Sequence, residues 1–212
     1  MMIKLKEKKK KKIEKTCKGK IYISQNDVFK NIRIINSYES LMGSNEKKII
    51  EELKNEEQIK ECEITIDGKI IPFSYFYQFE KEGEYQIKYN FKNNLKNTNH
   101  MFYGCDKLIY LNLSKINTKE VINMDKMFYN CVKLEELNLS SFNAPKLKSM
   151  EKMFYNCLSL TKLDLSNFMT KSNINMKQIF FNCNSLVADE LITNDQSLKS
   201  EIKRLNNLYG KK

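Results

Sequence analysis

The second half of this chain repeats itself every 26 residues, and this periodicity narrows the range of possible folds more than any other feature. Copies of one short motif begin at Met101, Met127, Met153 and Ile179. In the same register, leucines recur at three positions of the unit: Leu108, Leu134, Leu160 and Leu186; Leu111, Leu137 and Leu163; Leu113, Leu139 and Leu165. Such self-similarity is typical of stacked units, because one short unit cannot bury its apolar side until neighbours pack against it.

Each copy contains two local patterns. The segment 137–140 alternates leucine with polar residues, as does a strand that is buried on one face only. From Leu147 through Met150 and Phe154 to Cys157, apolar residues recur at spacings of three and four, which predicts one side of a short helix. The repeat therefore predicts one parallel strand and one short helix per coil.

The repeat also has a consensus, Phe-x-x-Cys-x-x-Leu-x-x-Leu-x-Leu-Ser-x-Phe, with Val or Leu and then Met before the next copy. Over residues 101–186 this pattern resembles the BspA-like leucine-rich repeats, the 26-residue units of a lipoprotein-like class of surface proteins. The resemblance implies a curved right-handed solenoid used for adhesion or protein contact, and an exported protein in bacteria. The chain departs from the pattern at Asn173, where Val or Leu is expected, and at Asp189, where an expected leucine is missing and the array ends.

The remaining sequence completes the expected architecture. Alternating runs between residues 20 and 91 indicate short strands, and 47–60 indicates a helix. Near the end, Leu198, Ile202, Leu205 and Leu208 recur at helical spacing. We expect an α/β leucine-rich-repeat solenoid preceded by a small β-rich N-terminal cap. Its parts are a basic, disordered tail (1–19), a β-rich capping domain with one helix (20–95), the solenoid (96–190) and a C-terminal capping helix (191–212).

Positive charge is concentrated at the start of the chain. The net charge is +11, and residues 1–20 alone hold ten Lys and two Glu. The rest of the chain is close to neutral, so the charge balance does not require a nucleic-acid-binding surface. Only Arg33 and Arg204 are arginines, and lysine lacks the planar fork suited to phosphate or guanine. We expect no specific nucleic-acid partner.

The lysine-rich tail is the main feature outside the repeat. Its densest part is Lys8, Lys9, Lys10, Lys11 and Lys12. A solvated tail without a binding role is one interpretation. The functional alternatives are a nuclear-import signal, a weak electrostatic contact with an anionic membrane, or binding to a polyanion.

Location is inferred from apolar runs and cysteines. No stretch reaches the roughly 18 consecutive apolar residues of a spanning helix, and lysines follow Met1-Met2 where a signal peptide would have its apolar core. We expect no transmembrane segment and an intracellular protein, cytoplasmic or nuclear, with reduced thiols. The alternative is a cell-surface protein that is exported by an unrecognised route.

Candidate catalytic groups do not assemble into a site. Cysteines recur once per coil at Cys105, Cys131, Cys157 and Cys183, on the apolar side, whereas zinc sites need ligands that converge on one point. The single histidine, His100, has no predicted partner for a triad or a metal centre. We expect no enzymatic activity, no cofactor and no metal.

The sequence supports binding to a partner better than it supports catalysis. Outward strand positions form two columns across successive coils: Tyr110, Glu136 and Lys162; Asn112, Asn138 and Asp164. Tyrosine, charged groups and amides are suited to contacts with a protein. We expect a monomeric, non-enzymatic protein-protein interaction module that binds an unidentified protein through this strand face. A polar face that only keeps the sheet soluble, a cell-surface adhesin and a tail-driven binder of membrane or polyanion remain as alternatives.

Overall fold

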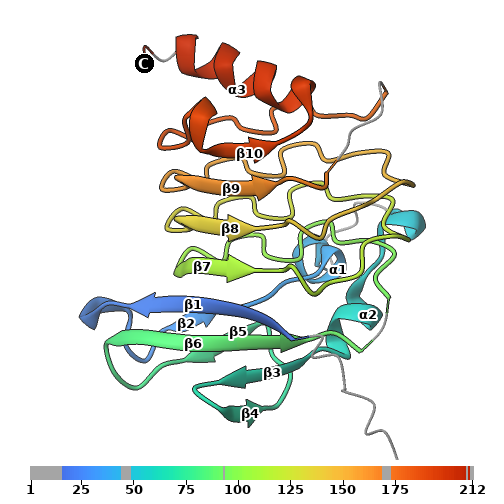
Figure 1. Ribbon diagram of the computed structural model, residues 1–212. Coiled ribbons are helices and arrows are strands. Elements are labelled where there is room, and N and C mark those ends of the chain that lie inside the picture. Colours follow the sequence, from blue (N-terminus) through green and yellow to red (C-terminus); the bar gives the residue numbers. More distant parts are fainter. Residues whose placement is uncertain (1–15, 44–48, 93, 169–172, 209, 211–212) are drawn as a thin grey trace, which may run out of the picture.

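A computed structural model of the chain describes residues 16–43, 49–92, 94–168, 173–208 and 210. Within these ranges the chain forms an eight-stranded mixed sheet, a second sheet of two strands, and a few short helices (Figure 1). The N-terminal strands and the repeat strands belong to the same large sheet, so the two halves share one core.

The N-terminal half supplies six strands: β1 (Cys17–Ile23), β2 (Asn31–Arg33), β3 (Glu63–Ile66), β4 (Lys69–Ile71), β5 (Phe76–Gln78) and β6 (Gly83–Asn90). β2 pairs only with β5, in the small sheet. The others pair antiparallel in the order β1-β6-β3-β4. Asp67 and Gly68 form the turn between β3 and β4 with φ of 45° and 83°, the left-handed pair that a tight hairpin of this kind requires.

The repeats supply the other four strands: β7 (Leu108–Asn112), β8 (Glu136–Asn138), β9 (Lys162–Leu165) and β10 (Leu191–Thr193). They pair in parallel, with Leu111 opposite Leu137 and Leu137 opposite Leu163. The last strand shifts by two residues, because a 3₁₀ turn, η3 (Ala188–Glu190), contains Asp189 and brings Leu191 opposite Leu163. The order of the large sheet is β10-β9-β8-β7-β1-β6-β3-β4.

Helices are short, with one exception. They are η1 (Gln25–Asp27), α1 (Tyr38–Met42), η2 (Glu51–Leu53), α2 (Glu56–Lys60) and α3 (Gln196–Leu208). At the start of α3, the Asp195 carboxylate accepts hydrogen bonds from the backbone N–H groups of Ser197 and Leu198, as an N-cap does. α3 packs beside β10 and η3, at the end of the large sheet (Figure 1). Its Leu198 and Ile202 side chains are buried. None of the helices in the described ranges is long and apolar enough to cross a membrane.

The predicted leucine-rich-repeat solenoid, with a short helix in every coil behind a separate β-rich cap, is wrong. In the described residues the repeats are part of the eight-stranded mixed sheet, and the segments expected to be helical are successive turns. Lys152 and Asn156 have φ of 55° and 59°, which no α-helix accommodates. The N–H groups of Met153 and Cys157 bond to carbonyls three residues earlier, at Met150 and Phe154. Such turns place residues three and four apart on one side, so their apolar pattern resembles that of a helix.

Domain limits in the structure also differ in detail from the sequence expectation. β1 begins at Cys17, inside the segment 1–19 that was expected to be a disordered tail. At the other end, the segment 191–212 starts with β10, and helix α3 begins only at Gln196.

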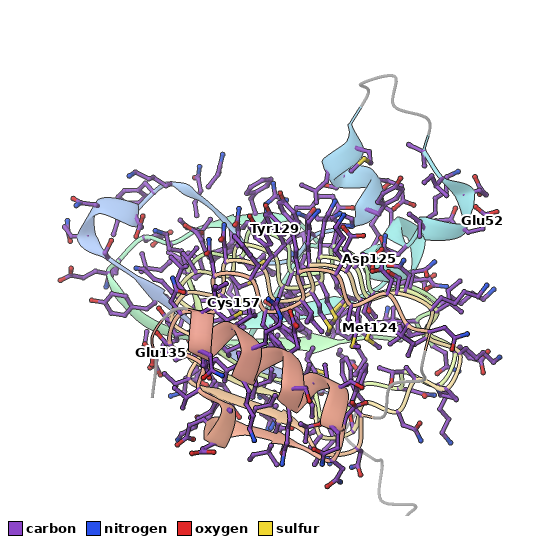
Figure 2. The ribbon with its side chains drawn as sticks, turned by 90° about the horizontal axis from the view of Figure 1, so that it is seen from above. Glu52, Met124, Asp125, Tyr129, Glu135 and Cys157 are labelled. Carbon is purple, nitrogen blue, oxygen red and sulfur yellow. The ribbon has the colours of Figure 1, made fainter. Side chains whose placement is uncertain are left out.

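Continuous side-chain ladders fill the core of the repeats. The rings of Phe102, Phe128, Phe154 and Phe180 stack nearly parallel, with centroids 5.5–5.7 Å apart. Figure 2 shows Met124 and Cys157 inside the molecule, where both are fully buried. Aromatic contacts of this kind add to the free energy gained by burying the rings.

Gly19 allows the two halves to join. It lies in β1 opposite Leu111 of β7, and a Cβ atom there would lie 3.1 Å from both the Leu111 side chain and the Tyr110 carbonyl oxygen. A larger residue would push β1 away from β7. The close approach makes β1 the link between the repeat strands and β6.

Candidate interaction surface

The large sheet has one buried face and one exposed face. Ile21, Ile87 and Leu137 point into the core, together with Ile34 and Ile59 from the segments that cover this side. Their neighbours along each strand point the other way and are exposed or half-buried. We call this exposed side the outer face.

The first predicted column lies together on the outer face. Tyr110 is opposite Glu136 on the neighbouring strand, and Glu136 is opposite Lys162. These side chains line a shallow cleft of about 420 Å³, whose other lining residues are Lys20, Glu84, Ile109, Glu135 and Thr161. The residues that the 26-residue spacing groups in this column therefore lie side by side along the cleft.

Opposite charges meet in this cleft. The Lys20 ammonium lies 2.9 Å from the Glu84 carboxylate, and the pair is partly exposed. The Thr161 hydroxyl donates a hydrogen bond of 3.1 Å to the Glu135 carbonyl oxygen, which holds adjacent repeats together at the cleft wall. Within the described part of the chain, no hydrogen bond or ion pair ties the side chains of Glu136 and Lys162. Both are therefore available to a partner.

The second predicted column has an additional, local role. The side-chain oxygens of Asn112, Asn138 and Asp164 each accept a hydrogen bond of 2.9 Å from the backbone N–H two residues later. This turn-forming bond ends the strand at the same point in every repeat. The three residues lie side by side as predicted, but they are half-buried and partly committed to the backbone.

Sequence reasoning missed the contribution of the N-terminal strands. Lys20 and Glu84 enter the cleft because β1 pairs with both β6 and β7. Residues 17–23 alternate between buried and more exposed positions, a pattern that could have placed Lys20 on the outer face. No local signal, however, shows which strand lies next to β7.

Another side of the molecule carries a ladder of partly exposed rings. Tyr103, Tyr129, Tyr155 and Phe181 stack with centroids 4.7–4.9 Å apart. Figure 2 shows Tyr129 and Asp125 on this side and Glu135 at a different edge of the molecule. Because the rings stack on one another, their faces are occupied, which favours a structural role for the ladder.

An amide ladder runs beside these rings. The Asn156 amide donates to the Asn130 side-chain oxygen, and the Asn182 amide donates to that of Asn156, both at 2.8 Å. Gly104 occupies this position in the first repeat, and the Arg33 side chain packs there instead, with its guanidinium 4.3 Å from the centroid of the Phe76 ring.

The groups most often used in catalysis are buried. Burial, assisted by the nearby Lys126 ammonium, lowers the pKa of His100 to about 3, so the imidazole is neutral. Burial raises the pKa of Cys17 to about 12 and that of Cys105, Cys131 and Cys157 well above the usual value. Among the described residues, no three His, Cys, Asp or Glu side chains are grouped so as to hold a metal ion. The outer face, by contrast, presents charged and hydrogen-bonding side chains.

The predicted tail site lies outside the described residues. This applies to all five of its lysines, Lys8, Lys9, Lys10, Lys11 and Lys12.

Comparison with known proteins identifies a family. Residues 73–194 match a family whose description reads "Mycoplasma protein of unknown function, DUF285". Searches among the curated proteins and among the solved structures found no match. The matched segment begins in the N-terminal strands and ends just beyond β10, so it includes every repeat strand.

Proposed function

Because this chain belongs to the DUF285 family of Mycoplasma proteins, whose function is unknown, we propose a function from the geometry of the structure. The chain is a non-enzymatic module that binds a protein through the outer face. The observation that carries this proposal is the cleft in which Tyr110, Glu136 and Lys162 meet Lys20 and Glu84. An aromatic anchor surrounded by charges of both signs fits a protein partner better than a small apolar ligand.

Burial of the reactive groups supports binding over catalysis. His100 and all six cysteines are buried, so a substrate would not reach them. Free thiols also fit a reducing compartment, and we therefore propose an intracellular location, cytoplasmic or nuclear.

Site-specific photo-crosslinking tests the binding face. Tyr110 in the full chain is replaced by a photoreactive phenylalanine analogue in the native cell, and Phe29 is replaced in the same way as a control. Phe29 is 65% exposed and does not line the cleft. We expect a discrete protein adduct from position 110, absent from position 29 and weakened by Glu136→Lys. An identical adduct pattern from both positions, or no adduct from position 110, would overturn the proposal.

Adhesion at the cell surface is a second candidate. The resemblance of the repeat consensus to the BspA-like surface proteins supports it. Protease treatment of intact cells separates the two locations, since only a surface protein is lost while a cytoplasmic marker stays intact.

Tail-driven binding is a third candidate, supported by the ten lysines among residues 1–20. Co-sedimentation with vesicles of anionic lipid, compared with neutral vesicles and with a chain lacking residues 1–15, tests it. Binding that needs both the tail and the anionic lipid would support this role, and it should weaken as salt is added.

A further inference from the structure

Strand pairing arranges the outer face into rows that cross the whole sheet. One row takes a residue from each strand, and from β4 to β10 it reads Ile70, Thr65, Lys88, Lys18, Asn112, Asn138, Asp164 and Ile192. We call it the first row. A second row lies two residues away along the strands and reads Asp67, Gln86, Lys20, Tyr110, Glu136 and Lys162. β1 and β7 lie at the centre of the sheet, with three strands beyond each.

We propose that a second copy of this chain packs against the outer face, about a two-fold axis that runs parallel to the strands between β1 and β7. This inference rests on the proposed function, because it names the partner of the same face. The axis places β1 over β7 of the other copy, β6 over β8, β3 over β9 and β4 over β10. The two-fold rotation does not shift residues along the strand direction, so each row lies over the same row of the other copy, read in the opposite direction. Every contact between the two copies therefore occurs twice.

Charge complementarity along the second row supports this arrangement. Asp67 lies in the exposed turn after β3, and one carboxylate oxygen accepts a hydrogen bond of 2.8 Å from the Gln86 backbone N–H. It faces Lys162 of the other copy, where its other oxygen can form an ion pair at each side of the axis. Lys20, which is ion-paired with Glu84 of its own chain, faces Tyr110, so its ammonium group can lie over the ring. The Gln86 amide donates one hydrogen bond to Glu84 of its own chain, and its second N–H can donate to the Glu136 carboxylate that it faces.

The first row is complementary as well. Lys88 faces Asn138 and Thr65 faces Asp164, so a donor meets an acceptor in each pair. Neither row brings two like charges together. If these two rows served only for solubility, there would be no reason for each to match itself when its order is reversed.

Apolar side chains lie at both ends of the first row. Ile70 on β4 is 63% exposed and Ile192 on β10 is 57% exposed, although both are large apolar residues. The same axis brings them together across the interface. Each would cover the other, which accounts for two exposed isoleucines on opposite edges of one sheet.

The area of the outer face determines how tightly the two copies are expected to bind. Eight strands at a spacing of about 4.8 Å span about 34 Å, and the two rows with their flanks extend about 12 to 15 Å along the strands. Each copy therefore contributes on the order of 500 Å², which is close to the lower limit for a specific interface. We expect a reversible dimer with a dissociation constant of about micromolar or weaker, further weakened by added salt.

Two opposite changes at Gln86 test the arrangement in the full chain. Gln86→Glu places like charges opposite Glu136 of the other copy, and Gln86→Lys places opposite charges there. Because the contact occurs twice, we expect the first change to weaken the dimer by about fivefold to tenfold and the second to tighten it by a similar factor. Sedimentation equilibrium from micromolar to millimolar concentrations measures both.

Matched controls separate this effect from a change in net charge and from misfolding. Gln78→Glu and Gln78→Lys make the same charge changes on β5, which belongs to the other sheet, and should leave the dissociation constant unchanged. Adding Glu136→Lys to the Gln86→Glu chain restores an opposite-charge pair and should restore the dimer.

The possible outcomes also distinguish this inference from the proposed function. The proposed dimer is wrong if the chain stays monomeric at millimolar concentration. It is also wrong if the dissociation constant does not depend on the sign of the charge at residue 86. If position 110 then still crosslinks to a different protein, the proposed function stands without it. A crosslinked product with twice the mass of the chain supports both.

Discussion

The thiol of Cys157 donates a hydrogen bond of 3.2 Å to the backbone carbonyl oxygen of Phe128 in the preceding repeat. Cys131 makes the same bond to Phe102, and Cys183 makes it to Phe154. The recurring cysteine therefore links one turn of the repeat to the next inside the apolar core.

Replacing Cys157 with alanine should destabilise the protein. The change leaves the buried Phe128 carbonyl without its side-chain donor and opens a small cavity, so we expect the free energy of unfolding to fall by about 1–3 kcal/mol. Urea denaturation measures this change. Leu158→Ala is the control, because Leu158 is the next residue along the chain and is 41% exposed. Equal losses for the two variants would contradict a structural role for the thiol.

Two substitutions at Asn156 should separate backbone strain from the amide ladder. Asn156→Gly removes the amide hydrogen bonds but keeps the backbone conformation favourable at φ of 59°. Asn156→Ala also loses the bonds and adds a Cβ in the left-handed region, so it should be less stable than the glycine variant by about 1 kcal/mol. Thermal unfolding of both variants beside the parent chain gives the comparison. An alanine variant as stable as the glycine variant would show that the left-handed turn is not retained.

His100 should make stability depend on pH below neutrality. Burial lowers its pKa from 6.5 to about 3 in the folded chain, so the unfolded chain binds a proton first. Its stabilising contribution is complete above pH 6.5 and decreases toward pH 3, by up to about 1.4 kcal/mol per pH unit. Urea titrations at several pH values should show this slope, and His100→Asn should flatten it. An unchanged slope in the variant would assign the dependence to other groups.

Asp27 should make stability depend on pH over a lower and narrower range than His100 does. Its carboxylate accepts a hydrogen bond from Ser24 and lies 2.9 Å from the Lys107 ammonium, and these contacts lower its pKa from 3.8 to about 2. The contribution is complete above pH 3.8 and is lost as pH falls to about 2, for a total of about 2 kcal/mol. Asp27→Asn should lower the free energy of unfolding at neutral pH and abolish this part of the acid dependence. The same change at the exposed Asp189 should alter little, and a similar loss there would argue against the buried pair.

The candidate surface was only partly accessible from sequence. Spacing alone placed Tyr110, Glu136 and Lys162 in one column, because a period of 26 residues fixes which residues of successive strands meet. Lys20 and Glu84 were missed because they belong to strands that join the repeats through long-range pairing. The backbone bonds of Asn138 and Asp164 were missed because an outward polar residue at a strand end has the same pattern whether or not it closes a turn.

The repeat period and the alternation of apolar and polar residues can be read directly from the sequence. They determine the parallel pairing of β7 to β9 and the inward direction of the leucines. They do not distinguish a helix from a series of turns around Met150 and Cys157, because both conformations bring residues three and four apart to the same side. They also do not show that β1 lies against β7, an antiparallel contact between distant segments that depends on Gly19 and on burying both halves in one core. Local periodicity is a property of neighbouring residues, whereas the order of strands in a sheet follows from how distant apolar surfaces pack.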